Sequence, residues 1–321
     1  MDDGHPPPGL EAQRGEDHHP QLDHWRANVG APVSLDIETH AAARLAGVDV
    51  LCWNVAIGLG RLEPVLERLR SPAHGAVGTT AERPLVVLLQ EAYREDHSVP
   101  QTHASAHHGG ELRTRERAGI DDVAARLGLS LRYAPSMRNG AHASDRGNAI
   151  LSNVRLAHAH AVLLPYVRQR RVAVAAQLDG HPGLTFVSGH LDVRGRVQRP
   201  GSSRRIGAGR TAQATALARH LDTIPGSVVL GADLNTFMGV ADPAVRALVL
   251  HGLHPAHRVG TWRHTFHTPV RLLLDHVLFR GEDIAGVEVS RIDELPRDAS
   301  RTVFGSDHHP LLARVALRGE R

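Results

Sequence analysis

The 321-residue chain contains one cysteine and no lysine. The single cysteine, Cys52, lies in an apolar run, so no disulfide can form within the chain and a reducing compartment is the simplest expectation. No apolar run reaches the roughly 18 residues that a membrane-spanning helix needs. The acidic, proline-rich start differs from the basic and then apolar pattern of a secretory signal. We therefore expect a cytoplasmic protein without a membrane span.

Aromatic residues are also scarce, at 3% of the chain. A protein that binds nucleic acid by stacking bases on aromatic rings normally has more of them. All 37 basic residues are arginine, but 34 acidic residues leave a formal net charge of only +3. Arginine forms forked contacts with phosphate and carboxylate groups, yet the codon bias of a GC-rich genome explains its excess more simply. Composition therefore does not identify a partner.

Residues 1–46 differ from the rest of the chain. The stretch 1–30 lacks periodicity and is rich in proline, glycine, histidine and charge, which predicts a disordered or loosely attached extension. Residues 34–46 have the pattern of a short helix, with Ser34 as its N-cap and Gly47 after its end. The chain is 41% hydrophobic, so residues 47–321 suffice for a full core, and we predict that they form one domain.

Apolar strands recur throughout this domain. We expect strands at residues 48–55, 84–91, 129–135, 148–153, 156–164, 171–178, 184–193, 226–235, 270–279 and 309–317. Helical spacing occurs at residues 61–70 (with Pro64 near the start), 118–128 and 207–224. Because many strands follow one another directly, the pattern favours α/β sheets with antiparallel portions covered by helices.

Polar side chains stand at the ends of several of these strands, namely Asn54, Glu91, His190, Asp192, Asp233, Asn235, Asp275, Asp307 and His308. Strands that end together in a sheet place such groups around one crevice. The carboxylates would repel one another at neutral pH unless a cation lies among them. Oxygen-rich clusters of this kind suit Mg²⁺ or Mn²⁺.

Each of these residues alone has a simpler explanation. Glu91 can be the first residue of a loop, Asn54 and Asn235 can be turn formers, and His190 can be a hydrogen-bonded core histidine. Asp275 is harder to dismiss, because a carboxylate within an apolar strand needs a partner. The functional interpretation therefore depends on the set and its order.

That order resembles the endonuclease/exonuclease/phosphatase superfamily, which includes DNase I-like nucleases, neutral sphingomyelinases and inositol polyphosphate 5-phosphatases. The motifs, from about Val48 to about Leu317, are VLCWNV, VVLLQE, RGNAILS, FVSGHLDV, VVLGADLN, LLLDHVLF and GSDHHP. The resemblance implies a four-layer α/β sandwich of two packed mixed β-sheets flanked by helices, with the active site at one edge. Residues 47–321 would be its catalytic domain.

The resemblance also implies a metal and an attacking water. Glu91 would ligate Mg²⁺ or Mn²⁺, with Asn54 nearby. Asp307 would help to bind the metal or water. Asp233 would orient or activate the attacking water.

Further residues would contact the phosphate group of the substrate. Asn235 would hold a phosphate oxygen, and His308, oriented by Asp275, would contact the phosphate or act as a base. His190 fits the branch of the superfamily that has His-Leu at this strand end. Arg171 is a candidate contact to substrate phosphate, although a solvated strand end explains it equally well.

The function expected from this resemblance is metal-dependent hydrolysis of a phosphate ester, because such catalysis depends on positioning water and neutralising charge. A nuclease acting on nucleic acid and a small phosphodiesterase or phosphatase both stay open. A noncatalytic binding protein on the same fold is an alternative of another class, although the main site positions are all filled. A histidine-rich metal-storage protein is a third, given 24 histidines that include His103, His107 and His108. Nothing in the sequence indicates an obligate protein partner.

The letters DHHP occur twice, at residues 17–20 and 307–310. The first copy lies in the extension, and we assign it no function beyond loose metal binding. In the second copy, Asp307 and His308 are the expected chemical residues. His309 occupies the variable position of the motif, so we expect it to be structural.

Overall fold

The structure is a computed structural model, and it describes residues 9–11, 19–71, 77–78, 80–102, 110, 112–113, 115–167, 169–193, 207–257, 264–267, 271–293 and 302–318. Two seven-stranded sheets form its centre. In spatial order the first sheet contains β1 (Gly9–Glu11), β7 (Leu156–Leu163), β8 (Val172–Leu178), β9 (Leu184–His190), β10 (Ser227–Asp233), β12 (Asp275–Arg280) and β11 (His254–Pro255). The second sheet contains β13 (Ile284–Arg291), β14 (Leu311–Leu317), β3 (Gly47–Asn54), β4 (Leu85–Arg94), β6 (Asp145–Ser152), β5 (Ser130–Arg138) and β2 (Val33–Leu35).

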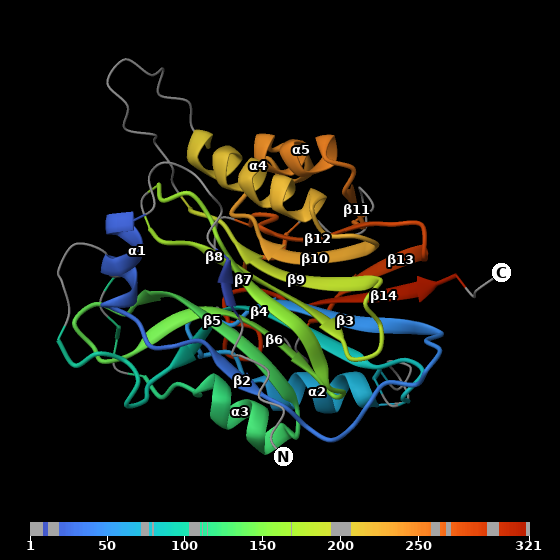
Figure 1. Cartoon of the computed structure of the whole chain (residues 1–321), viewed down its shortest axis with the longest axis horizontal. Helices are drawn as coiled ribbons and strands as arrows, with labels where there is room; N and C mark the ends of the chain where they lie inside the picture. Colours follow the sequence, from blue (N-terminus) through green and yellow to red (C-terminus); the bar gives the residue numbers. More distant parts are fainter. Residues whose placement is uncertain are drawn as a thin grey trace.

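Helices cover the outer face of each sheet, which gives four layers (Figure 1). Helices α4 (Ala208–Asp222) and α5 (Pro243–Leu250) lie over the first sheet, and α2 (Leu62–Arg70) and α3 (Ile120–Leu127) lie over the second. A short helix, α1 (His19–Arg26), lies to one side. The expected four-layer sandwich is therefore confirmed. Among the described residues, no helix is both long enough and apolar enough to cross a membrane.

Three apolar clusters join these layers, and strand β3 shows how they arise. Val50 and Cys52 point into the cluster between the two sheets. Leu51 and Trp53 alternate with them and point into the cluster beneath α2 and α3. Side chains alternate between the faces of a strand, so a strand covered on both faces needs apolar residues at every position. The unbroken apolar run of the sequence follows from this burial.

The strands and helices expected within residues 47–321 are all present, with shifted ends. The strand expected at 270–279 begins only at Asp275, so this carboxylate starts β12 and does not lie in the middle of a strand. Sequence reasoning missed α5 and β13. The start of α5 had a recognisable signal: Asp242 caps the helix by accepting a hydrogen bond from the Ala244 N–H, and Pro243 occupies the first turn.

The helix expected at residues 34–46 was wrong. Val33–Leu35 form β2, which pairs antiparallel with β5 at the edge of the second sheet. Arg132 holds this strand by donating to the Leu35 carbonyl and the Asp36 carboxylate. The backbone of Ala42 and Ala46 then bonds to the 81–82 turn. Pairing with neighbouring segments therefore outweighed a weak local preference for helix.

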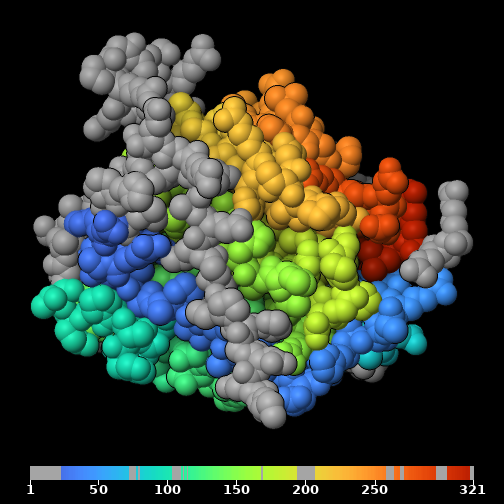
Figure 2. All heavy atoms as spheres, in the orientation of Figure 1, coloured from blue at the N-terminus to red at the C-terminus, as the bar shows by residue number. Residues whose placement is uncertain are grey.

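Part of the N-terminal segment packs on the domain. The Trp25 ring is buried, and its indole N–H donates to the Ser136 carbonyl. The Gly30 N–H donates to the buried carboxylate of Asp145, which also pairs with Arg94. Figure 2 shows the blue N-terminal residues lying directly against the teal and green ones. Residues 1–8 and 12–18, which include Asp17 and His18 of the first DHHP copy, lie outside the described residues.

Candidate active site

Strand pairing places three polar residues side by side at one edge of the first sheet. Asp233, the last residue of β10, pairs with His190, the last residue of the parallel strand β9. On its other side Asp233 pairs with Asp275, the first residue of the antiparallel strand β12. All three side chains are buried. The residues expected from three distant motifs therefore meet in one row.

The second sheet completes the cluster from across the sandwich. Asn54, the last residue of β3, donates from Nδ2 to Asp233 Oδ2 at 2.8 Å. His308 precedes the neighbouring strand β14, and its Nδ1 lies 2.7 Å from Asp275 Oδ2. The other ring nitrogen of His308 lies 3.9 Å from Asp233 Oδ2. The cluster therefore bridges the two sheets where their strands end.

Residues that the sequence did not single out hold this geometry. The Ser306 hydroxyl donates to the Asn54 carbonyl at 2.6 Å and accepts from the His308 N–H at 3.1 Å. The Trp53 indole N–H donates to the His308 carbonyl. The Thr265 hydroxyl oxygen accepts the N–H of Asp275. Both partners of the His308–Asp275 pair are thus fixed through their backbones.

Asn235 turns back toward the cluster. Its φ of 51° is left-handed, a conformation that asparagine tolerates better than most residues. Asp233 Oδ1 accepts the Asn235 N–H at 2.9 Å, which stabilises this turn. The side-chain Nδ2 donates to the Leu191 carbonyl and lies 3.0 Å from His190 Nε2. Asn235 therefore touches both Asp233 and His190.

Arg171 lies inside the protein behind His190. It is only 3% exposed, and its Nη1 lies 3.0 Å from His190 Nδ1. Its other contacts are with Gln169, at 3.0 Å, and with the carboxylate of Asp192, at 3.7 Å. In this arrangement Arg171 orients His190.

Glu91 lies at an irregularity in β4. The pairing of β4 with β6 shifts between Leu89 and Ala92, and Glu91 has a left-handed φ of 56°. Such a bulge re-aims a side chain and stores backbone strain, and both features are common next to active sites. Glu91 is partly exposed, and so is Asp307, whose side chain is 43% exposed. These two carboxylates lie at the open side of the cluster.

The buried charges perturb one another. Burial and the nearby Asp275 carboxylate raise the pKa of Asp233 to about 7, against the opposing effect of His308 and the Asn54 hydrogen bond. Burial alone would lower the pKa of His308, but the carboxylates of Asp275, Asp233 and Asp307 raise it to about 10. His308 is therefore an imidazolium at neutral pH, and Asp233 is close to its midpoint.

The pKa of His190 is shifted in the opposite direction to that of His308. Burial lowers its pKa well below the usual histidine value, and the positive charges of Arg171 and His308 lower it further. His190 is therefore neutral at pH 7. A neutral imidazole accepts a hydrogen bond at only one nitrogen, so the ring accepts either from Arg171 or from Asn235.

The chemistry of the open side fits a hard divalent cation. Burial raises the pKa of Asp307, and the negative charge of Glu91 raises it further, so the two carboxylates act on each other. A hydrogen bond from its own backbone N–H and the charge of His308 act on the Asp307 carboxylate in the opposite direction. Asn54 has less to offer a metal, because its amide oxygen already accepts the Ala56 N–H at 3.0 Å. Ligand atoms of Asp233, Asp275 and His308 also lie within 4.8 Å of one another.

Arg146, in the RGNAILS motif, is a further residue of this region that the sequence did not single out. It is 9% exposed, and its one hydrogen bond within the described part of the chain is a weak one to the Met137 sulfur at 3.6 Å. Its Nε has no hydrogen-bond partner there. Besides burial, the charge of Arg146 contributes to lowering the pKa of both His190 and Arg171. A buried guanidinium with free donors next to this cluster can receive an anion.

The histidines His103, His107 and His108 lie outside the described residues.

Comparison with known proteins gives a consistent result. A model of the endonuclease/exonuclease/phosphatase family matches residues 51–308. No curated protein sequence matches the chain. Solved structures with a similar fold include the human Nocturnin catalytic domain with a bound sulfate anion, at 17% identity, covering 90% of this chain and 98% of that one, with a TM-score of 0.52.

Two other similar structures come from bacterial enzymes. The 3′ phosphatase NExo from Neisseria, bound to a product DNA hairpin, is 18% identical and covers 83% of this chain and 98% of its own, with a TM-score of 0.50. A mannosyl-6-phosphatase from Bacteroides thetaiotaomicron is 11% identical and covers 84% and 99%, with the same TM-score of 0.50. At these identities the likeness shows a shared fold and nothing more specific.

Proposed function

The chain belongs to the endonuclease/exonuclease/phosphatase family, and we propose that it is a divalent-metal-dependent phosphoesterase that hydrolyses a phosphodiester or phosphomonoester with an activated water. The observation that carries this proposal is the buried cluster of Asp233, Asp275 and His308, joined across the two sheets by Asn54. Two buried carboxylates beside an imidazolium are costly for stability. Their concentration at one edge of the sandwich is explained by chemistry at that edge.

The His308 imidazolium supplies a positive charge for the phosphoryl group. Asp275 accepts a hydrogen bond from His308 Nδ1–H at 2.7 Å, which leaves Nε2–H free to donate to a phosphate oxygen. Phosphoryl transfer depends mainly on positioning and on neutralising developing charge, and a buried cation at a fixed position does both. Asp275 is thus a positioning residue, and His308 is the group that touches the substrate.

Asp233 is placed to accept a proton from the attacking water. Its carboxylate is held by the Asn54 amide and by the Asn235 N–H, so its direction is fixed before the substrate binds. Its pKa of about 7 is near the value that is most effective for a general base at neutral pH. Asn54 supports this role by orienting Asp233.

Glu91 and Asp307 would hold the divalent cation, Mg²⁺ or Mn²⁺, with Asn54 adjacent. When bound, the cation supplies Lewis acidity for the phosphate oxygens. The carboxylates of Glu91 and Asp307, which act on each other electrostatically, are the oxygen donors that such an ion prefers. Asn235 and Arg146 would contact other phosphate oxygens, whereas neutral His190, held by Arg171, supports Asn235.

The substrate class is open within this proposal. One similar structure is a 3′ phosphatase with a DNA product and another is a mannosyl-6-phosphatase, so both nucleic acid and a small phosphate ester are candidates. A nuclease, which is one of the alternatives, would use the same site on a nucleic-acid substrate. A noncatalytic binding protein would not need the Asp233–His308–Asp275 cluster, and a histidine-rich metal-storage protein would bind many metal equivalents without turnover.

A Mg²⁺/Mn²⁺ hydrolysis panel tests the proposal. It contains bis-p-nitrophenyl phosphate, single- and double-stranded DNA, RNA, sphingomyelin, inositol phosphates and a sugar 6-phosphate. We expect turnover of at least one substrate that chelation removes and Mg²⁺ restores. The matched variants are His308→Gln in the site and His251→Gln at the C-terminal end of α5, and only the first should lose activity. Equal turnover in the wild type and in His308→Gln would refute the proposal.

A further inference from the structure

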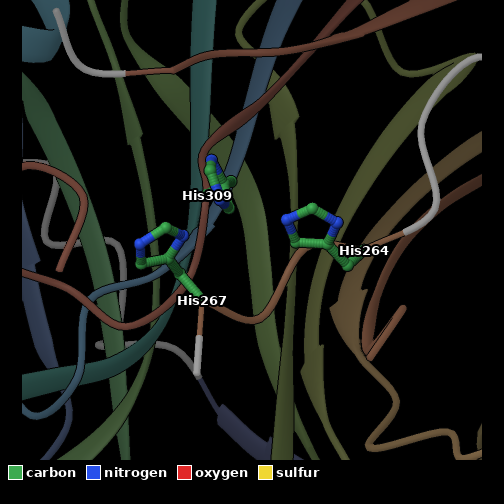
Figure 3. A group of neighbouring side chains, drawn as sticks. All are labelled: His264, His267 and His309. Atoms are coloured by element: carbon green, nitrogen blue, oxygen red, sulfur yellow. The ribbon is translucent and has the colours of Figure 1, made fainter. Parts of the chain in front are cut away.

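Three histidines that take no part in the proposed chemistry gather beside the second DHHP copy. They are His264, His267 and His309, and a ligand nitrogen of each lies within 4.8 Å of those of the other two. Figure 3 shows the three imidazole rings around one common space. The rings of His264 and His267 pack edge-on against that of His309, with centroids 5.5 and 5.3 Å away.

The backbone explains why these rings meet. Residues 264–267 run alongside residues 307–309: the His267 N–H donates to the Asp307 carbonyl, and the His309 N–H donates to the Thr265 carbonyl. Phe266 pairs with His308, and their rings lie 4.9 Å apart. Since neighbouring residues of an extended segment point to opposite sides, His308 faces Asp275 while His309 faces the other two histidines. The cluster of His264, His267 and His309 is thus separate from the His308–Asp275 pair.

His309 has unused donor capacity. It is 4% exposed, and its Nε2 has no hydrogen-bond partner among the residues that the structure describes. Its Nδ1 lies 2.8 Å from Asp293 Oδ1, but these two atoms are not aligned as a hydrogen bond. An isolated buried imidazole nitrogen is costly unless something binds it. A simple packing role for His309 would leave that nitrogen unexplained.

We propose that His264, His267 and His309 bind one transition-metal ion of the zinc class. Imidazole nitrogen suits zinc, whereas Mg²⁺ prefers oxygen. A tetrahedral zinc at about 2.0–2.1 Å from each ligand needs nitrogens roughly 3.4 Å apart, so the rings close in by small side-chain rotations. Three histidines leave the fourth position for water. Asp293, 2.8 Å from His309 Nδ1, would give the carboxylate–histidine–metal arrangement that orients such ligands once the two groups align as a hydrogen bond.

Two arginines lie near this site. Arg291 Nη1 is 3.3 Å from His264 Nε2, but its guanidinium also pairs with Asp293 at 3.0 Å. The Asp293 carboxylate lies between Arg291 and His309, and its charge offsets that of the guanidinium. Arg271 is exposed, so solvent screens it. A metal here would link residues 264–267 to the loop that carries Asp307 and His308.

Zinc titration of the full chain tests this inference without reference to turnover. The titration is run in the Glu91→Gln background with excess Mg²⁺, so that the catalytic edge does not compete for zinc. Affinity is measured against a chromogenic chelator, and Co²⁺ serves as a spectroscopic probe of tetrahedral coordination. The variants are His264→Asn and His267→Asn, and the control is His254→Asn on the exposed strand β11.

We expect one zinc equivalent that binds more tightly than all others and gives a tetrahedral Co²⁺ spectrum. His264→Asn and His267→Asn should each lose it, whereas His254→Asn should keep it. Asp293→Asn, which leaves all three ligands in place, should weaken it by roughly 10- to 100-fold. Circular dichroism before metal addition verifies that each variant folds. A tight equivalent that survives in His264→Asn and His267→Asn, or no tight equivalent in the parent, overturns the proposal.

Discussion

Replacing Asp275 by asparagine should separate the chemistry of the site from its stability. The Asp275 carboxylate touches His308 at 2.7 Å through Oδ2, and its Oδ1 has no hydrogen-bond partner among the described residues. Both side chains are almost completely buried. Asparagine has nearly the same shape, so the substitution removes a charge and little packing.

The size of the effect follows from this one hydrogen bond. A hydrogen bond to a charged group contributes about 1.5–3 kcal/mol, and each 1.36 kcal/mol corresponds to about tenfold in rate. If Asp275 acts by holding His308 as an imidazolium, Asp275→Asn should lower kcat by about 10- to 150-fold. Removing the ring itself, in His308→Ala, should cost roughly 10²–10³-fold.

Although kcat should fall in Asp275→Asn, the free energy of unfolding should rise or stay the same. The Asp275 carboxylate repels that of Asp233 and contributes to its raised pKa. In Asp275→Asn this repulsion disappears, and His308 can release its proton, so no unpaired charge is left inside. The free energy of unfolding, from urea titration followed by circular dichroism, should therefore equal or exceed that of the wild type. Active sites commonly show this opposition of activity and stability.

The double variant decides whether Asp275 acts through His308. Kinetics of wild type, Asp275→Asn, His308→Ala and the double variant are measured on the best substrate of the panel at saturating Mg²⁺. Groups that act as a unit are not additive, so the double variant should be no slower than His308→Ala alone. A loss equal to the product of the two single losses would refute the reasoning, as would a large loss of stability in Asp275→Asn.

Three further substitutions have expected outcomes. Glu91→Ala should reduce Mg²⁺-dependent turnover by at least roughly 10²-fold with unchanged circular dichroism, and wild-type turnover would reject its assignment. Arg146→Gln should lower kcat/KM by about 10- to 150-fold through one lost charged hydrogen bond to phosphate, and unaltered kinetics would exclude that contact. Asp145→Asn should lower the free energy of unfolding by about 3–5 kcal/mol, because it leaves the buried Arg94 guanidinium without its closest charged partner and with only Asp96, at 3.7 Å; an unchanged urea midpoint would contradict this.

The fold could be predicted because burial on both faces marks the strands in the sequence. The run from Val48 to Trp53 is apolar apart from Asp49, since strand β3 lies between two apolar clusters. Where burial is one-sided the sequence was less informative. Only the first residue of strand β13 is buried, and this strand was missed. Strand β2 was mistaken for a helix because its pairing with Tyr133 and Leu131 involves residues about a hundred positions away.

The members of the candidate site were predictable, but their contacts were not. Asp233 and His190 stand near the ends of expected strands and Asp275 within one, and strand register places all three in one row. That Asn54 reaches Asp233 across the sandwich depends on how the two sheets pack, which no local pattern encodes. The burial of Arg171 behind His190 likewise follows from packing.

Two adjacent histidines of one motif show most directly that the sequence does not determine the environment of a side chain. His308 and His309 have the same side chain and neighbouring positions, yet they face opposite sides of the segment that Phe266 pairs with. The pKa of His308 is raised to about 10, because three carboxylates more than offset its burial. His309 meets two other imidazoles and one carboxylate shared with Arg291. Histidine therefore supplies a positive charge at position 308 and a candidate metal ligand at position 309. The difference arises because the backbone points the two side chains in opposite directions.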